Sequence, residues 1–231
     1  MVVRIVLKSA AAAKPYRTRV ARTGRGAAYG LWVEAMTKAE RAEATVLIDF
    51  WFGRPDSAER FKPREVWFKV DPDFDAALRA RFQPLQQRAA RGGCADWAEE
   101  AEPCLALILL LDQLPRNLYR GRPEAFATDA MARDAARAAL AHGFDRSLPA
   151  VWRQFLYLPF EHSEDLADQE KSVALFEALA RDPAMARGGD YARRHHDIIA
   201  RFGRFPHRNR ILGRASSTEE EEFLKGPNSS F

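Results

Sequence analysis

The chain has 231 residues, of which 47% are hydrophobic and 29% are charged, which is the balance of a folded globular protein. A chain of this length can bury enough surface in one core without disulfides or bound metals. Its longest strongly apolar run, Cys104–Leu111, is too short to span a bilayer, so we expect no integral membrane protein.

The formal net charge of +4 arises in the first part of the chain. Residues 1–36 hold seven basic residues and one acid, whereas the remainder holds two more acids than basic residues. Because residues 37–231 are nearly neutral, we expect no nucleic-acid-binding surface on the folded part.

Residues 1–35 differ in composition from the rest of the chain. They are rich in Ala and Arg, poor in acids and without a long apolar segment, which argues against a secretory signal, although a transit peptide has a similar composition. Met36–Glu40 has the pattern of a natural start directly before an amphipathic helix. We therefore predict a disordered or non-native extension over residues 1–35, a single helical domain over residues 36–231 and a cytoplasmic location.

The sequence at the beginning of this domain predicts two amphipathic helices. Thr37 and Glu40 have the spacing of a capping box, and apolar residues then follow with helical spacing as far as Gly53. Asp71 and Pro72 are typical of a second helix start, and a pair of glycines after position 91 ends that helix.

The third predicted helix, Asp96–Leu111, has the most apolar face and is expected in the middle of the core. Pro103 either kinks this helix or marks its true start. Cys94 and Cys104 lie ten residues apart with no CxxC motif and no nearby histidine, so we expect reduced core thiols rather than a zinc or redox pair.

The second half predicts four further helices. They are Ala130–His142 after a cap at Thr128 and Asp129, one that begins near Pro149, one capped by Ser163, and Tyr191–Phe202. No segment alternates apolar and polar residues between turn signals, and β-branched residues are scarce, so a sheet is not expected. The sequence predicts an all-α fold, a compact array of antiparallel helix pairs.

Three segments of the sequence carry a family resemblance: Leu110–Tyr119 (LLDQLPRNLY), Phe155–Asp165 (FLYLPFEHSED) and His196–Asn209 (HDIIARFGRFPHRN). Together with the terminal Gly226–Phe231, they are similar to the bacterial family called domain of unknown function 924. The resemblance covers Thr37–Phe231 and implies an all-helical fold like that of tetratricopeptide arrays. It implies no activity, substrate or cofactor.

Arginines concentrate after the last predicted helix, where residues 198–218 contain no acid. The cluster comprises Arg201, Arg204, Arg208, Arg210 and Arg214, with His207 and Asn209 among them. Arginine side chains bind carboxylates and phosphates bidentately, and Pro206 could start a short helix over His207–Leu212 whose N–H groups face the same region. Alternatively, the acidic residues between Glu161 and Glu170 pair with these arginines and fasten two helices together.

Two further polar groups are candidates for a site. Glu161 and His162 follow a turn, and a histidine there is either an orienting hydrogen-bond partner or an acid–base group. Asp112, Arg116 and Asn117 end the most buried predicted helix, where an apolar wall meets solvent. The alternative for this second group is C-terminal capping by Arg116.

Metal chemistry is not indicated by the sequence. His196 and Asp197 form an HD pair, and His162 could be an upstream ligand, but no aspartate follows Asp197 to complete a phosphohydrolase pattern. The sequence also lacks GxSxG, HExxH, P-loop and Rossmann motifs. We therefore predict no metal and no cofactor.

Two functions fit these candidates. The first is a binding protein whose Arg- and His-lined pocket or groove captures an anionic small molecule or a peptide carboxylate. The second is an enzyme in which His162 or His207 acts as the acid–base group and Glu161 or Asp112 orients it. Histidine and carboxylate groups converging on a concave site would favour the enzyme, whereas an open groove of spread arginines would favour the binding protein.

Overall fold

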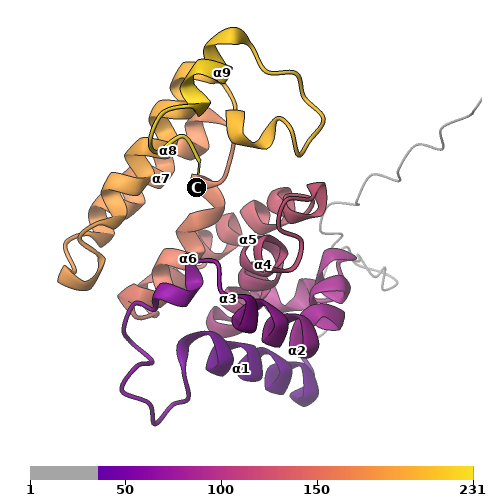
Figure 1. Ribbon diagram of the computed structural model, residues 1–231. Coiled ribbons are helices and arrows are strands. Elements are labelled where there is room, and N and C mark those ends of the chain that lie inside the picture. The colour runs from indigo at the N-terminus through magenta and orange to yellow at the C-terminus, as the bar shows by residue number, and fades with distance from the viewer. Residues whose placement is uncertain (1–35, 231) are drawn as a thin grey trace, which may run out of the picture. The chain divides into compact units, whose positions relative to one another are not determined.

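The computed structural model describes residues 36–230, and every regular element in this part of the chain is a helix (Figure 1). The all-α prediction is therefore confirmed for these residues, while the likeness to tetratricopeptide packing stays a prediction. The predicted extension over residues 1–35 lies outside the described residues. Within residues 36–230, no helix is long and apolar enough to cross a membrane.

The first two α-helices begin at caps that the sequence predicts. Helix α1, Lys38–Phe52, begins after Thr37, whose hydroxyl accepts the Glu40 N–H while the Glu40 carboxylate accepts the Thr37 N–H. It ends at Gly53, whose φ is 101°. Glycine adopts this positive φ easily because it has no Cβ. Helix α2, Pro72–Ala90, has an aspartate cap and ends before a glycine turn.

The prediction of one helix over Asp96–Leu111 is wrong, because the segment contains several elements. They are the 3₁₀ turn η2 (Ala95–Glu99), α3 (Ala101–Ile108) and the first part of the π turn η3 (Leu109–Gln113), after which α4 (Leu114–Leu118) follows. Pro103 stands in the first turn of α3, where a missing N–H costs little, and so marks a helix start.

Pro115 explains the π turn. Proline has no N–H to bond the carbonyl four residues earlier, and its ring clashes with that carbonyl in an α-helix. The chain widens here into a π turn, and the Thr128 hydroxyl donates to the Leu111 carbonyl at 2.5 Å. The Asp112 carboxylate, which belongs to this wider turn, is completely buried.

The rest of the chain forms five more α-helices and short 3₁₀ turns. The helices are α5 (Asp129–Ala141), α6 (Ala150–Glu161), α7 (Leu166–Leu179), α8 (Gly188–Phe202) and α9 (Thr218–Leu224). The remaining 3₁₀ turns are η1 (Glu65–Trp67), η4 (Pro123–Ala125), η5 (Phe144–Arg146), η6 (Pro183–Met185) and η7 (Pro206–Arg208).

Two predicted boundaries in this part are wrong. The cap of α7 is Asp165, whose side chain accepts two backbone N–H groups, whereas the hydroxyl of Ser163 donates to Asp168 at 2.9 Å. The helix expected over His207–Leu212 is only the 3₁₀ turn η7. Beyond that turn the chain reverses through Gly213, whose φ is +66°.

Helix α3 lies at the centre of the main core and packs against α1, α5 and α6. Helix α6 also packs against α7 and α8, which run side by side (Figure 1). A separate small cluster of Ile198, Ile199 and Phe205 packs outside the main core.

Candidate functional site

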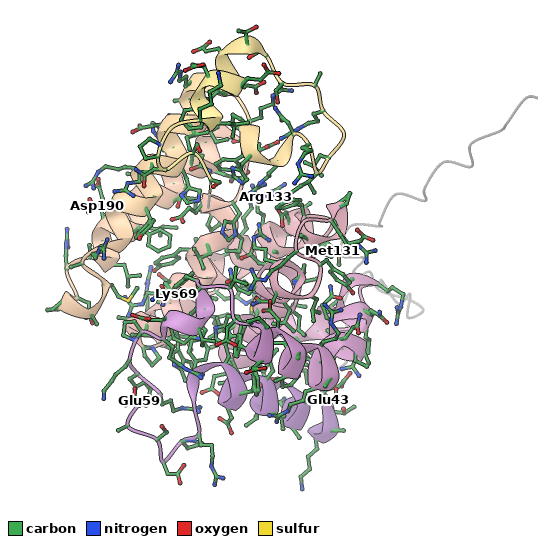
Figure 2. All side chains as sticks on the ribbon, in the orientation of Figure 1. Glu43, Glu59, Lys69, Met131, Arg133 and Asp190 are labelled. Atoms are coloured by element: carbon green, nitrogen blue, oxygen red, sulfur yellow. The ribbon has the colours of Figure 1, made fainter. Side chains whose placement is uncertain are left out.

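A pocket of about 290 Å³ lies where three segments far apart in the sequence meet. They are the start of α5 with the turn before it, the turn between α6 and α7, and η7 with the turn after it. The lining comprises Pro123, Phe126, Ala127, Asp129, Arg133, His162, Glu164, Arg208 and Leu212. Figure 2 labels Arg133, on the part of α5 nearest the C-terminal helices.

A larger cavity, of about 720 Å³, lies beside the end of α1, and no predicted site residue lines it. Because this larger cavity is lined by no histidine, the smaller pocket is the better candidate for acid–base chemistry.

The centre of the site is a contact between Asp112 and His162, from the π turn and the end of α6. The Nδ1 atom of His162 lies 2.8 and 3.0 Å from the two carboxylate oxygens of Asp112. The Gln113 amide donates to the same carboxylate, and Arg116 lies 3.4 Å from it. Burial alone would raise the pKa of Asp112, but Arg116 and His162 outweigh burial and hold that pKa well below its usual range.

The ring of His162 is neutral at neutral pH. Burial and the neighbouring Arg116 lower its pKa, and the opposing effect of Asp112 is smaller. Because Asp112 is ionised and can only accept, the single ring proton sits on Nδ1. Nε2, on the opposite edge of the ring from Asp112, therefore bears a lone pair, and His162 is a lining residue of the pocket.

Arg208 is a buried cation on the pocket wall, with 6% of its surface exposed. Its guanidinium lies between the rings of Phe126 and Phe205, 4.7 and 4.4 Å from their centroids. It donates to the His162 carbonyl at 3.1 Å, but its ion pair with Asp129 is long, at 3.6 Å. Within residues 36–230 its buried Nε has no hydrogen-bond partner. Burial lowers the pKa of Arg208 to about 10, which leaves it protonated at neutral pH.

The two carboxylates of the pocket wall already accept hydrogen bonds from arginines that do not line the pocket. Arg116 holds Asp129 with two hydrogen bonds, at 2.9 and 3.2 Å. Arg214 holds Glu164 in the same way, at 2.7 and 3.0 Å. These two acids therefore leave little negative charge to satisfy Arg208.

Arg133, the second arginine of the wall, is also weakly paired. It lies 3.5 Å from Asp168, which Arg137 already holds at 2.7 and 2.9 Å. The pocket therefore presents two arginines whose nearest carboxylates are engaged with other arginines.

Two candidates from the arginine cluster lie outside the pocket wall. Arg204 donates twice to Glu220 of α9, at 2.6 and 2.7 Å. The Asn209 amide donates to Ser216 and its oxygen accepts from Arg214. Both residues fasten the C-terminal segment. The alternative interpretation, arginines paired with the acidic segment, applies to Arg214, while Arg204 pairs with an acid beyond that segment.

Two other candidates are also absent from the lining. Asn117 donates to Asp75 of α2 at 2.7 Å, so it joins α4 to α2. His207 packs near Phe205, with 5.6 Å between ring centroids, and burial lowers its pKa to about 4. Arg116 lies behind the wall, where it also donates to the Asp112 carbonyl, the capping contact that was the alternative for this residue.

Glu161 lies behind the pocket, beside a histidine that the sequence analysis did not select. Its Oε1 is 3.4 Å from Nδ1 of His195 on α8. Burial and the charge of Asp112 raise the pKa of Glu161 to about 8, and burial lowers the pKa of His195 to about 3. At neutral pH both side chains are therefore uncharged.

The sequence analysis missed two charged residues of the wall, Asp129 and Arg133, and included Glu164 only among the acids expected to pair with the arginines, as it does with Arg214. One signal was available, because Asp129 and Arg133 are four residues apart and thus share one face of a helix. Asp129 instead entered the analysis only as part of a helix cap.

Residues 36–230 contain no group of three or more His, Cys, Asp or Glu side chains placed to hold a metal ion. The HD pair lies on α8, where the Asp197 carboxylate is exposed and contacts its neighbour His196 at 3.2 Å. Neither residue lines the pocket.

Comparison with known proteins identifies the family of this chain. The model of a family described as a bacterial protein of unknown function, DUF924, matches residues 47–228. The chain belongs to this family. A solved protein of unknown function from Agrobacterium tumefaciens is 40% identical to this DUF924 chain, with a TM-score of 0.72, over 80% of this chain and 99% of that one. No curated protein matches it. The resemblance found in three sequence segments is thereby confirmed.

Proposed function

We propose that this DUF924 protein binds a small anionic molecule in the pocket beside Arg208. The observation that carries the proposal is the incomplete pairing of a buried, protonated guanidinium on the pocket wall. A buried charge is costly unless hydrogen bonds and counter-charge compensate it. A carboxylate or phosphate group would supply both to Arg208.

The charges around the pocket support the same ligand class. Five arginines surround it: Arg116, Arg133, Arg137, Arg208 and Arg214. The carboxylates that pair with them are Asp112, Asp129, Asp134, Glu164 and Asp168. On the pocket wall itself, however, Arg133 and Arg208 lie 3.5 and 3.6 Å from carboxylates that other arginines already hold, which favours a ligand with a negative charge.

Thermal unfolding with increasing phosphate tests the proposal. A ligand at a hundred times its Kd stabilises the folded state by about 2.7 kcal/mol, which is a clear rise in Tm. Arg208→Met keeps the apolar stem and should abolish this rise, and Arg133→Met should reduce it. Arg210→Met is the matched control, because Arg210 is exposed and lies two residues from Arg208 but outside the pocket. A rise of the same size in Arg208→Met would contradict the proposal.

A second function, acid–base catalysis, is favoured by the contact between Asp112 and His162. In that case Nε2 of His162 would accept a proton from a substrate or a water molecule while Asp112 orients the ring. An enzyme of this kind should hydrolyse members of a panel of phosphate monoesters or carboxylate esters at a rate that rises with pH. His162→Gln should lose the activity and still fold. Binding without turnover across the panel would support the binding protein instead.

The cytoplasmic location is part of the proposal, supported by the free, buried thiols of Cys94 and Cys104, which are common in a reducing compartment. Fractionation of cells that produce the full chain tests it, and recovery of the protein outside the cytoplasm would contradict it.

A further inference from the structure

We infer that the ligand of this pocket is a small oxyanion that carries its own O–H group, such as a 2-hydroxy acid or hydrogen phosphate, with His162 Nε2 accepting that hydrogen. The inference rests on the proposed anion binding at Arg208 and adds the chemical class of the ligand.

The direction of hydrogen bonding in the pocket follows from contacts behind it. Asp112 is completely buried and accepts from Gln113 as well as from Nδ1 of His162, with Arg116 alongside. It has no proton to give, so Nδ1 must donate and Nε2 must accept. An anion without hydrogen would place its oxygen lone pairs against the lone pair of Nε2, which is repulsive.

The charged groups that face His162 preserve this arrangement. Arg116 of α4 and Arg208 of η7 are cations, Asp112 and Asp129 are their counter-charges, and His195 of α8 is neutral. No neighbour in this set would force a second proton onto the ring of His162. The pocket therefore combines a cationic donor, Arg208, with a neutral acceptor.

A hydroxyl group suits this acceptor better than an ammonium group. The pocket carboxylates Asp129 and Glu164 are each held by two hydrogen bonds from an arginine, so they leave no net negative charge for a cation. A neutral imidazole can accept from a hydroxyl without any charge. The volume of about 290 Å³ is at the small end for ligand pockets, which favours a small acid over a peptide.

Four probes test the inference in pairs that differ in one O–H group. Calorimetric titration of the full chain at pH 7 compares phosphate with sulfate and lactate with propionate. Because a site group that loses its hydrogen-bond partner costs about 1 to 3 kcal/mol, we expect the O–H-bearing member of each pair to bind about 5 to 150 times more tightly.

Two variants test whether His162 and Asp112 cause the difference in affinity between the members of a pair. His162→Gln can donate as well as accept, and Asp112→Asn removes the carboxylate that fixes the proton on Nδ1. Each variant should reduce the ratio of the two affinities within a pair to less than about threefold. One variant that unfolds at the same temperature as the wild type is enough for the test. Arg133→Met is the control, since it should weaken all four probes and leave both ratios unchanged.

The outcomes separate the two proposals. Equal binding of both members of a pair, or ratios that survive in a folded His162→Gln or Asp112→Asn, would overturn the inference while anion binding stands. Failure of all four probes to bind would overturn anion binding and the inference with it. Tighter binding of phosphate and lactate that depends on His162 would support both.

Discussion

Two buried arginines of similar exposure, in two regions of the molecule, have different surroundings. Arg60, in the loop after α1, is 8% exposed, and Arg208, on the pocket wall, is 6% exposed. Arg60 pairs with Asp49 at 2.6 Å, donates to the Gly53 carbonyl and lies over the ring of Trp152. Arg208 is also held by aromatic rings, but its carboxylate is 3.6 Å away and its Nε has no partner among residues 36–230.

Burial of a charge alone therefore does not indicate a ligand. Arg60 is a structural contact, because its hydrogen bonds close the loop on α1. Arg208 shares the burial and the aromatic contacts but lacks close counter-charge, and it lines a pocket. Unmet hydrogen-bonding capacity is therefore the property that distinguishes a candidate binding group from a structural clamp.

The largest effect on the free energy of unfolding is expected from substitution of Arg60. Arg60→Met leaves Asp49 without its counter-charge and the Gly53 carbonyl without this donor, so the free energy of unfolding should fall by about 2 to 4 kcal/mol. Urea unfolding of the variant measures this. Arg54→Met is the control, because Arg54 lies in the same loop with an exposed side chain and should change stability by less than about 0.5 kcal/mol. Equal effects of the two substitutions would show that the contacts of Arg60 do not hold the loop on α1.

The next largest effect on the free energy of unfolding is expected at Glu161, behind the pocket, and it depends on pH. Its pKa of about 8 lies above the usual 4.5, so the stability that it contributes is complete below pH 4.5 and is lost as the pH rises through 8. Glu161→Gln keeps the uncharged form at every pH. It should therefore raise the free energy of unfolding at pH 9 by about 1 kcal/mol or more and change it little at pH 4.5.

Thermal melts across this pH range check the prediction, with Glu59→Gln as the control because Glu59 is exposed. A variant that loses stability at pH 9 would show that Glu161 is ionised there and paired in the fold.

The sequence predicts helix ends well where the signal is local. Thr37 and Gly53 bound α1 as expected, because a capping box and a glycine act on neighbouring backbone groups. Ser163 and Asp165 are both good caps, and the choice between them follows from a contact of Ser163 with Asp168. A decision that depends on tertiary partners is not visible in a local pattern.

The site shows the same limit more strongly. Asp112 and His162 were separate candidates 50 residues apart, and their contact depends on the π turn and on the packing of α6. Arg204 and Arg208 are equivalent in the sequence, since both belong to one acid-free run. Only the position of Glu220 on α9 makes Arg204 structural, and only two aromatic rings place Arg208 on the pocket wall.

A smaller effect is expected at Thr128, which supports the turn that holds Asp112. Thr128→Val keeps the shape but removes the donor to the Leu111 carbonyl, so the free energy of unfolding should fall by about 1 kcal/mol. Thr45→Val is the control, because the Thr45 hydroxyl also donates to a backbone carbonyl but is exposed. Chemical unfolding of both variants measures the difference, and equal losses would show that the contact at Leu111 adds nothing to the turn.

The smallest effect on stability is expected at Arg208 itself. Arg208→Met removes a cation whose burial disfavours its charge, as its pKa of about 10 shows, and the methionine can occupy the space between Phe126 and Phe205. Asp129 keeps its two hydrogen bonds from Arg116, so no buried carboxylate loses its counter-charge. The free energy of unfolding without ligand should therefore change by less than about 1 kcal/mol. A loss of about 3 to 5 kcal/mol in urea unfolding would mean that Arg208 is a clamp like Arg60, and the proposed anion site would lose its main support.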